Sequence, residues 1–278
     1  FQFLGDLALF LNYKKTIITC HDIYNFLQRK SLKNPIFTQK YALMGLKKCR
    51  IIIAISNFTK NELIDKLKIP EDKIVVIKNA INREMFKQIP KNKISEIKPL
   101  FPNYKKILYV GSEAERKNII TLFKAFYLIK RRSKKFKLIR VGPSTHSHVI
   151  KSLGLEKDVV YLKNITNQRL TEIYNLCDLF ITPSLYEGFG FPGIEAASCG
   201  TPVICSEIPV FREIYQDFPI YFPPKDYKTL AKIILESIDN EVLKNEMSMK
   251  GINTVKAYSW KDSAEKYLKL NKFILDNQ

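Results

Sequence analysis

Short apolar runs alternate with amphipathic stretches along the whole chain, and this alternation predicts βαβ units built around parallel sheets. Most runs are apolar at nearly every position, which is typical of strands that helices cover on both faces. The predicted strands are TIIT (16–19), IIIA (51–54), IVVI (74–77), ILYV (107–110), KLIRV (137–141), VVYL (159–162), LFIT (179–182) and PVIC (202–205). The fold class is therefore α/β with parallel sheets.

The amphipathic stretches between the runs predict helices over 118–132, 168–177 and 192–198. The closing segment SWKDSAEKYLKLNKFIL (259–275) predicts one more helix. It starts with Ser259, and Asp262 follows three residues later, in the spacing of a capping box.

The periodic pattern breaks down in the middle of the chain, where prolines and charged residues gather without a sustained repeat. We predict an interdomain linker there, over 89–104. A partial N-terminal domain would then span 1–88, because that segment offers only three strands. A second domain over 105–257 has at least five strands and could fold alone. Residues 258–278 would form a helix that packs back towards the N-terminal domain.

The chain has 278 residues and carries 46 Lys and Arg against 27 Asp and Glu, a formal charge of +19. Such an excess concentrates anions, so nucleic acid, an anionic membrane face and phosphorylated substrates are the candidate partners. A compositional bias towards lysine is the alternative explanation. The chain shows no RNA-binding motif and no zinc-finger spacing, which argues against nucleic acid as a partner.

Several features bear on location. The stretch FQFLGDLALFL (1–11) is too short for a membrane helix and has no basic leader, so we expect neither a span nor a secretory signal. The chain starts with Phe1 and not with Met, so we expect a fragment. Its five cysteines are an odd number without a CxxC pair, which favours a reducing compartment and buried structural thiols. We therefore predict a cytoplasmic protein, with peripheral contact at the inner face of the membrane as an option.

The most informative segment is SLYEGFGFPGIEAASCGTPVICS (184–206). Gly188 and Gly190 follow a predicted strand and allow a tight turn, and Pro192 suits the first turn of a helix. The amino terminus of a helix after such a loop is a common phosphate-binding site. Glu187 precedes the loop and Glu195 lies within the helix, and we expect both carboxylates to face the same crevice and to accept hydrogen bonds from ligand hydroxyls.

Two adjacent cations, Arg116 and Lys117, lie in VGSEAERKN (110–118), which follows another predicted strand. At the carboxyl edge of the same sheet they would neutralise a diphosphate leaving group. His146 and His148 follow a later strand with the alternate spacing of a metal site, but the sequence offers no third ligand, so we predict a surface loop and no metal.

Together these motifs resemble glycosyltransferase family 4, the retaining nucleotide-sugar transferases of the two-domain GT-B fold. The resemblance rests on EGFGFPGIE and AASCGTPVICSEIPVFREI, on the RKN segment, and on KIVVIKNAIN, TCHDI, AISNFTKNEL and YSWKDSAEKYL. It covers nearly the whole chain. Members of that family begin with a glycine-rich loop and several strands that should precede TIIT, so the resemblance also implies that the N-terminal domain is incomplete.

The resemblance implies that the domain over 1–88 lies on the acceptor side and that the domain over 105–257 binds the nucleotide sugar. It also implies roles for particular residues. Glu187 would contact hydroxyls of the donor sugar, while Glu195 would contact the ribose. Lys117, assisted by Arg116, would hold the diphosphate, and His21 would reach the cleft from the first domain. The implied donor-binding residues are Gly111, Ser112, Gly188, Phe189, Gly190, Phe191 and Glu195. Neither a metal nor a cofactor is implied, because the departing phosphate is thought to accept the proton of the acceptor hydroxyl.

The predicted activity is transfer of a hexose, with mannose and glucose as candidates, from a GDP- or UDP-linked donor. The acceptor would be a saccharide or a polyprenyl-phosphate-linked saccharide in polysaccharide biosynthesis, and an anionic membrane would suit the basic surface. Two alternatives stay open from the sequence: a nucleotide-sugar epimerase with the same fold, and a noncatalytic fragment that only binds the nucleotide sugar.

Overall fold

The computed structural model describes residues 15–27, 36–90, 93, 101–143 and 145–276. The chain divides into two compact units. The first unit comprises Phe1–Ala80, Glu187–Phe189 and Tyr258–Gln278, and the second comprises Ile81–Tyr186 and Gly190–Ala257. The apolar stretch 1–11 lies outside the described residues.

The first unit contains a three-stranded parallel sheet in the order β1-β2-β3. Its strands are β1 (Ile17–Cys20), β2 (Ile51–Ala54) and β3 (Ile74–Val76), so the three predicted strands are confirmed to within a residue at each end. Its helices are α2 (Tyr24–Leu27), α3 (Ile36–Lys48), α4 (Asn57–Leu67) and α13 (Trp260–Asp276). Apolar residues of the sheet and of α4 form one core, which includes Ile52, Ala54 and Leu63.

The predicted terminal helix is confirmed as α13. The Ser259 hydroxyl accepts a hydrogen bond from the Asp262 amide at 3.4 Å, as a capping residue does. Two hydrogen bonds join this helix to the rest of the first unit, one to the segment after β3 and one to strand β1. Ser263 donates to the Lys78 carbonyl at 2.8 Å, and the hydroxyls of Thr19 and Tyr267 lie 3.1 Å apart.

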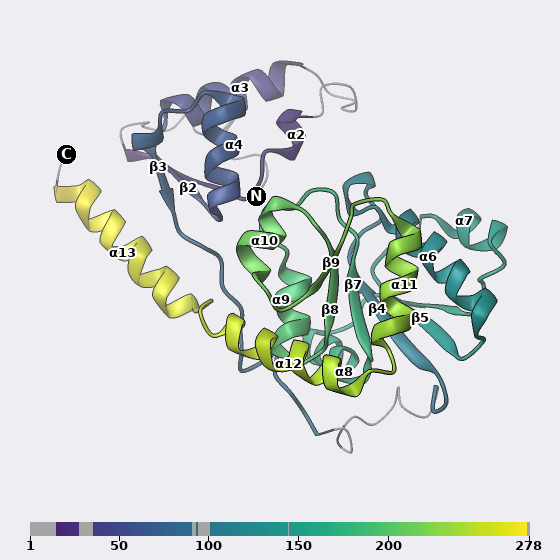
Figure 1. Ribbon diagram of the computed structural model, residues 1–278. Coiled ribbons are helices and arrows are strands. Elements are labelled where there is room, and N and C mark those ends of the chain that lie inside the picture. The colour runs from purple at the N-terminus through teal and green to yellow at the C-terminus, as the bar shows by residue number, and fades with distance from the viewer. Residues whose placement is uncertain (1–14, 28–35, 91–92, 94–100, 144, 277–278) are drawn as a thin grey trace. The chain divides into compact units, whose positions relative to one another are not determined.

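The second unit is built around a six-stranded parallel sheet in the order β6-β5-β4-β7-β8-β9 (Figure 1). Five of its strands were predicted and are confirmed. The strands are β4 (Lys105–Val110), β5 (Phe136–Val141), β6 (Val159–Leu162), β7 (Leu179–Thr182), β8 (Val203–Ser206) and β9 (Ile220–Phe222). The strands β4, β5 and β6 follow one another towards one edge of the sheet, and β7, β8 and β9 follow one another towards the other edge. This is the order of the Rossmann fold, with its switch point between β4 and β7.

The edge strand β9 is the one that the sequence analysis missed. Its three residues lie between Pro219 and Pro223, which predict a turn when they are read without their neighbours. Proline is tolerated beside an edge strand, because the missing amide lies outside the ladder. Pairing with β8 therefore decides the structure, with Ile204 opposite Ile220 and Ser206 opposite Phe222.

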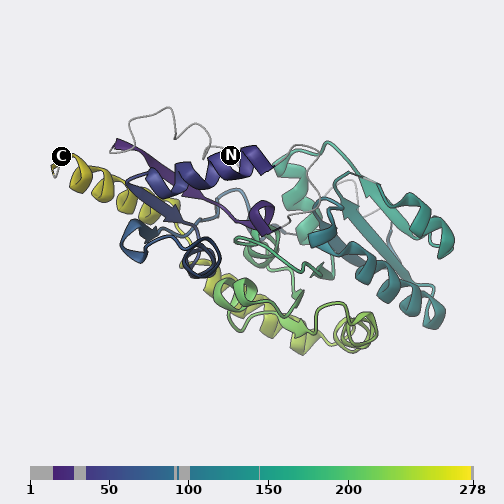
Figure 2. The same cartoon turned by 90° about the horizontal axis from the view of Figure 1, so that it is seen from above.

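Helices cover both faces of the larger sheet. On one face, α6 (Ile119–Arg132) and α11 (Tyr227–Ser237) lie side by side, as both views show (Figures 1 and 2). Their buried apolar residues pack with Ile107, Leu179 and Ile204 into one core. The remaining helices are α7 (Ser147–Ser152), α8 (Asn167–Leu176), α9 (Phe191–Ser198), α10 (Pro209–Tyr215) and α12 (Glu241–Val255).

The boundary between the units falls after Ala80, eight residues before the predicted end of the first domain at residue 88. The segment that follows is held by side chains of the second unit. Ser198 donates a hydrogen bond to the Phe86 carbonyl at 2.5 Å, and the Ile89 amide donates to the Asn175 side chain at 2.8 Å. These contacts depend on helices more than eighty residues away, so the local sequence could not reveal them.

All five cysteines are free and buried. Burial raises the pKa of the Cys20 thiol to about 12 and that of Cys49 to about 11. At neutral pH these groups are protonated and behave as small apolar side chains, in agreement with the predicted structural role.

Candidate active site

Two loops meet at the switch point of the larger sheet, where ligands bind in open α/β folds. One follows β4 and the other follows β7. The Leu185 amide donates to the Arg116 carbonyl at 2.7 Å, and the Asn118 side chain donates to the Pro183 carbonyl at 3.0 Å. The Arg116 guanidinium also donates to the Tyr186 carbonyl at 3.2 Å. The loops are therefore fixed to each other before any ligand arrives.

The loop after β4 carries the predicted residues Gly111, Ser112, Arg116 and Lys117. The Ser112 carbonyl accepts a hydrogen bond from the Tyr109 hydroxyl at 2.7 Å, which shapes the start of the loop. Arg116 and Lys117 lie in a 3-10 helix, Glu115–Lys117, and both side chains are half-buried. The structure thus places both cations at the carboxyl end of β4, as the sequence analysis expected.

The loop after β7 leads into α9, which begins at Phe191 with Pro192 in its first turn, as predicted. Gly190 is the N-cap residue and has a φ of 89°. A Cβ atom here would lie 2.7 Å from the Phe211 ring, so glycine is required both by the backbone and by the packing. A glycine N-cap offers no side-chain acceptor to the first-turn amides of α9, and the positive end of the helix points to the switch point.

Glu195 lies in the second turn of α9 and is mostly buried. Its carboxylate accepts a hydrogen bond from the Tyr174 hydroxyl of α8 at 2.9 Å. Burial raises the pKa of Glu195, although the Tyr174 hydrogen bond opposes the shift. The sequence analysis found the glutamate but not its tyrosine partner, because the two are 21 residues apart on different helices.

The other predicted residues belong to the first unit, which includes Glu187–Phe189. Glu187 is only 7% exposed. The backbone of Gly188 passes so close to the His21 carbonyl that a Cβ atom would overlap it. Phe189 is buried with its ring edge-to-face on Tyr258, at a centroid distance of 5.6 Å. His21 itself directly follows β1, and burial of part of its side chain lowers its pKa.

A buried ion pair lies beside the switch point, and the sequence analysis missed it. The Arg140 guanidinium on β5 is fully buried, between the rings of Tyr109 and Tyr161 at 5.8 and 5.3 Å from their centroids. It lies 2.9 Å from the carboxylate of Glu113, which belongs to the loop after β4. The sequence did contain one sign of this pair. Arg140 lies inside an apolar strand, and a buried cation requires an anionic partner.

Glu113 also ties the loop after β5 to the loop after β4. Its second oxygen accepts hydrogen bonds from the Thr145 amide and hydroxyl and from the His146 amide, and lies 2.8 Å from the His146 ring. Burial raises the pKa of Glu113, but these hydrogen bonds and the charge of Arg140 outweigh it, so the net shift is downward. His146 thus pairs with a carboxylate and is not simply a surface-loop residue.

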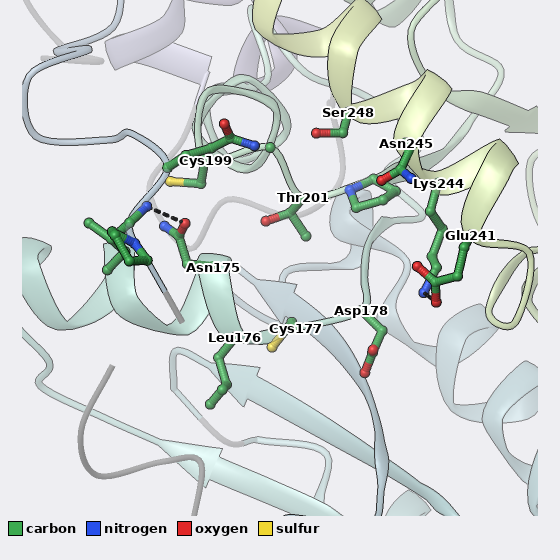
Figure 3. Close-up of a pocket in the computed structure, with 15 residues that line it drawn as sticks. Asn175, Leu176, Cys177, Asp178, Cys199, Thr201, Glu241, Lys244, Asn245 and Ser248 are labelled. Carbon is green, nitrogen blue, oxygen red and sulfur yellow. Dashed lines mark hydrogen bonds and ion pairs between the residues drawn. The ribbon is translucent and has the colours of Figure 1, made fainter. Parts of the chain in front are cut away.

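A polar cavity of about 500 Å³ lies in another part of the second unit (Figure 3). The Asn175 side chain, which lines the cavity, accepts a hydrogen bond from the Ile89 amide. Lys244, which also lines it, forms an ion pair with Glu241 at 2.7 Å. Asp178, which also lines it, directly precedes β7, so the cavity lies at the amino ends of the strands. None of the predicted site residues lines it, and it is separate from the candidate active site.

Among the residues that the structure describes, no group of three or more His, Cys, Asp or Glu side chains could hold a metal ion. Within the same residues, no helix has the length and apolar character needed to cross a membrane.

Comparisons with known proteins agree with the geometry. The family model described as Glycosyl transferases group 1 matches residues 90–254, and the one described as Glycosyltransferase Family 4 matches residues 3–85. The chain is 26% identical over 262 residues to O-antigen chain mannosyltransferase B of Escherichia coli, and the match covers 90% of this chain and 68% of that protein.

A longer relative from the same organism, serotype-specific mannosyltransferase WbdA, is 27% identical over 265 residues; the match covers 90% of this chain but only 32% of the relative. Among solved structures, the Anabaena protein HepE in complex with UDP and glucose superposes with a TM-score of 0.82. That similarity covers 96% of this chain and 74% of HepE, at 18% sequence identity, and shows a common fold.

Proposed function

Because the chain belongs to the glycosyl transferases group 1 family, we propose that it transfers a hexose from a nucleoside diphosphate sugar to a saccharide or lipid-linked acceptor, with retention of configuration. Its two α/β units are those of the GT-B fold. The observation that carries the proposal is the switch point, where the loop that holds the cations Arg116 and Lys117 is hydrogen-bonded to the loop that leads into α9.

In the proposed reaction, the bond between the anomeric carbon and the phosphate oxygen breaks, and the acceptor oxygen bonds to the same face of the sugar. The proton of the acceptor hydroxyl passes to the departing phosphate. Arg116, Lys117 and the positive end of α9 would stabilise the negative charge that grows on the diphosphate. The hydrogen bonds between the two loops support this role, because charges on fixed loops need little reorganisation during a reaction.

The glutamates would hold the rest of the donor. We assign Glu187 to the sugar hydroxyls and Glu195 to the ribose hydroxyls, since carboxylates accept strong hydrogen bonds from such donors. His21 would act near the sugar and the acceptor. Mannose is the favoured sugar, because the relatives described above are named as mannosyltransferases. UDP is a candidate nucleotide because HepE was solved with it, and GDP is the other.

A calorimetric titration with UDP, GDP and ADP tests the donor site first. We expect one nucleotide to bind selectively and Glu195→Gln to weaken it about tenfold or more, as the loss of a hydrogen bond to a charged group does. Glu246→Gln is the matched control, because Glu246 is an exposed glutamate on α12 of the same unit, paired with Lys250. No binding of any nucleotide would contradict the donor site.

Transfer itself needs a second experiment. The chain is incubated with radiolabelled GDP-mannose or UDP-glucose and a lipid extract, and the products are separated. We expect Glu187→Gln to abolish transfer while the circular dichroism spectrum stays unchanged. A free epimerised nucleotide sugar, formed without an acceptor, would instead indicate an epimerase.

A further inference from the structure

A groove of about 750 Å³ lies between α6 and α11 in the second unit. These two helices lie side by side over one face of the sheet (Figure 2). Its apolar lining consists of Leu128, Ala231 and Leu235. Its charged lining consists of Arg131, Arg132, Lys228, Lys232 and Glu236. Each helix therefore contributes both apolar residues and cations to the groove.

The groove carries an excess of positive charge. Four cations and one carboxylate line it, and the closest approach of a cation to Glu236 is 3.8 Å, from Lys232. Some other lysines of the same unit are compensated more tightly. Lys130 and Lys137, for example, both contact Asp158, at 3.0 and 3.1 Å. The excess of cations means that the groove attracts anions.

Helix electrostatics explain only part of this arrangement. Arg131 and Arg132 end α6, where cations are favoured by the negative end of the helix dipole. Lys228, however, lies in the first turn of α11, where the dipole disfavours a cation. Four exposed cations around one groove, including one at an unfavourable helix end, are better explained by an anionic ligand than by helix stability.

The chemistry of the lining indicates which anion fits. Guanidinium groups bind phosphate oxygens through two parallel hydrogen bonds, and Arg131 also lies 6.0 Å from the Tyr127 ring centroid, which restricts its side chain. Single-stranded nucleic acid would need exposed aromatic rings for base stacking, and none of the residues that line the groove is aromatic. Apolar residues and cations that line one groove instead suit the glycerol and upper acyl chain of a phospholipid beneath its phosphate.

We propose that the groove between α6 and α11 docks this chain on anionic phospholipid, with the four cations on the headgroup phosphates and Leu128 and Leu235 against the glycerol region. The proposal rests on the proposed function only for its biological purpose, which is to bring the enzyme to a lipid-linked acceptor. Binding itself requires neither donor nor transfer, and it can be measured separately.

Flotation with vesicles tests the proposal. We expect the chain to float with vesicles of phosphatidylcholine mixed with phosphatidylglycerol but not with phosphatidylcholine alone, and to lose this binding as salt is added. Each basic residue near an anionic surface contributes about 1 kcal/mol, so Arg131→Gln with Arg132→Gln should lower the partition coefficient roughly 25-fold.

The matched control is Lys151→Gln with Lys157→Gln, which removes the same charge from exposed positions outside the groove in the same unit. An equal loss in both double variants would overturn the proposal, because general charge would then explain the binding. Absence of vesicle binding would overturn it too, as would displacement from vesicles by RNA at equal phosphate concentration. A nucleotide titration of the arginine variant should match wild type, so failure here is distinct from failure of the proposed function.

Discussion

Glu195 is placed where binding and stability make opposite demands. The role that we propose for Glu195, accepting hydrogen bonds from ribose hydroxyls, favours an ionised carboxylate, yet this one lies mostly buried on α9, where it accepts a hydrogen bond from the Tyr174 hydroxyl. Burial raises its pKa, which means that the folded protein holds the proton more tightly than the unfolded chain does. Ionisation at neutral pH therefore lowers the stability of the folded protein.

Replacing the carboxylate by an amide should reverse this effect. We expect Glu195→Gln to be more stable than wild type at pH 7, because a pKa that is raised on folding means that the ionised carboxylate destabilises the folded protein. The Tyr174 hydroxyl can still donate to the amide oxygen. The advantage should vanish below the ordinary pKa of 4.5, where the wild-type carboxyl is protonated in both states. Urea unfolding at both pH values measures it, and a less stable variant at pH 7 would contradict the argument.

The same substitution at Glu113, which forms an ion pair with Arg140, should instead lower the stability of the folded protein. Glu113→Gln leaves a fully buried guanidinium without its anion, and we expect a loss of about 3 kcal/mol at pH 7. The pKa of Glu113 is lowered in the folded protein, so its contribution exists above the unfolded value and disappears as the pH falls through the folded one. The loss in the variant should therefore shrink in acid.

A glutamate in an exposed pair provides the comparison for that measurement. Glu207 contacts Arg212 at 2.6 Å, but about half of each side chain is exposed. Glu207→Gln should cost less than 1 kcal/mol in urea unfolding. Equal effects of the two substitutions would show that burial of the Glu113 pair has no energetic consequence.

At the scale of the element, the start of α9 depends on one glycine. In Gly190→Ala, the new methyl group would meet Phe211 and Tyr215 and the backbone would keep a left-handed φ. We expect a loss of roughly 3 kcal/mol, with strain and overpacking both contributing. Nucleotide binding should weaken as well, because the first turn of α9 would move. Unfolding and calorimetric titration of the same preparation measure both effects.

A substitution at Gly154 measures the effect of backbone strain without that of overpacking. It also has a left-handed φ, of 64°, but a Cβ atom there would meet nothing within 4 Å. Gly154→Ala should therefore cost about 1 kcal/mol, from backbone strain alone, and leave nucleotide binding unchanged. If both alanine variants lost the same stability, packing around Gly190 would not matter.

The elements also show what the sequence could reveal. Apolar runs predicted every strand of the sheets except β9, because a buried parallel strand has a clear local pattern. Glycine and proline spacing predicted the loop and helix around Gly190 and Pro192. The partner of Glu195, the Glu113 and Arg140 pair and the end of the first unit at Ala80 all depend on residues distant in sequence. Local patterns carry no information about such contacts, and only the fold brings these residues together.

At the scale of the whole molecule, the division into two units has a thermodynamic consequence. Each unit has its own buried apolar cluster, one around β2 and α4 and the other around the six-stranded sheet and its helices. Unfolding of such a chain need not be a single two-state transition. Arg116, Lys117, the start of α9 and Glu195 belong to the second unit, so a bound nucleotide should stabilise that unit in particular.

The single tryptophan makes this difference measurable. Trp260 lies at the start of α13 in the first unit and is half exposed, so its fluorescence reports the unfolding of that unit. Circular dichroism reports both units. At a nucleotide concentration 100 times the Kd, the second unit should gain about 2.7 kcal/mol, which corresponds to roughly 5–10 °C in Tm. The transition seen by Trp260 should stay in place, and Glu195→Gln at the same nucleotide concentration should show a smaller shift. A tryptophan transition that moves together with the circular dichroism signal would show that the two units unfold as one.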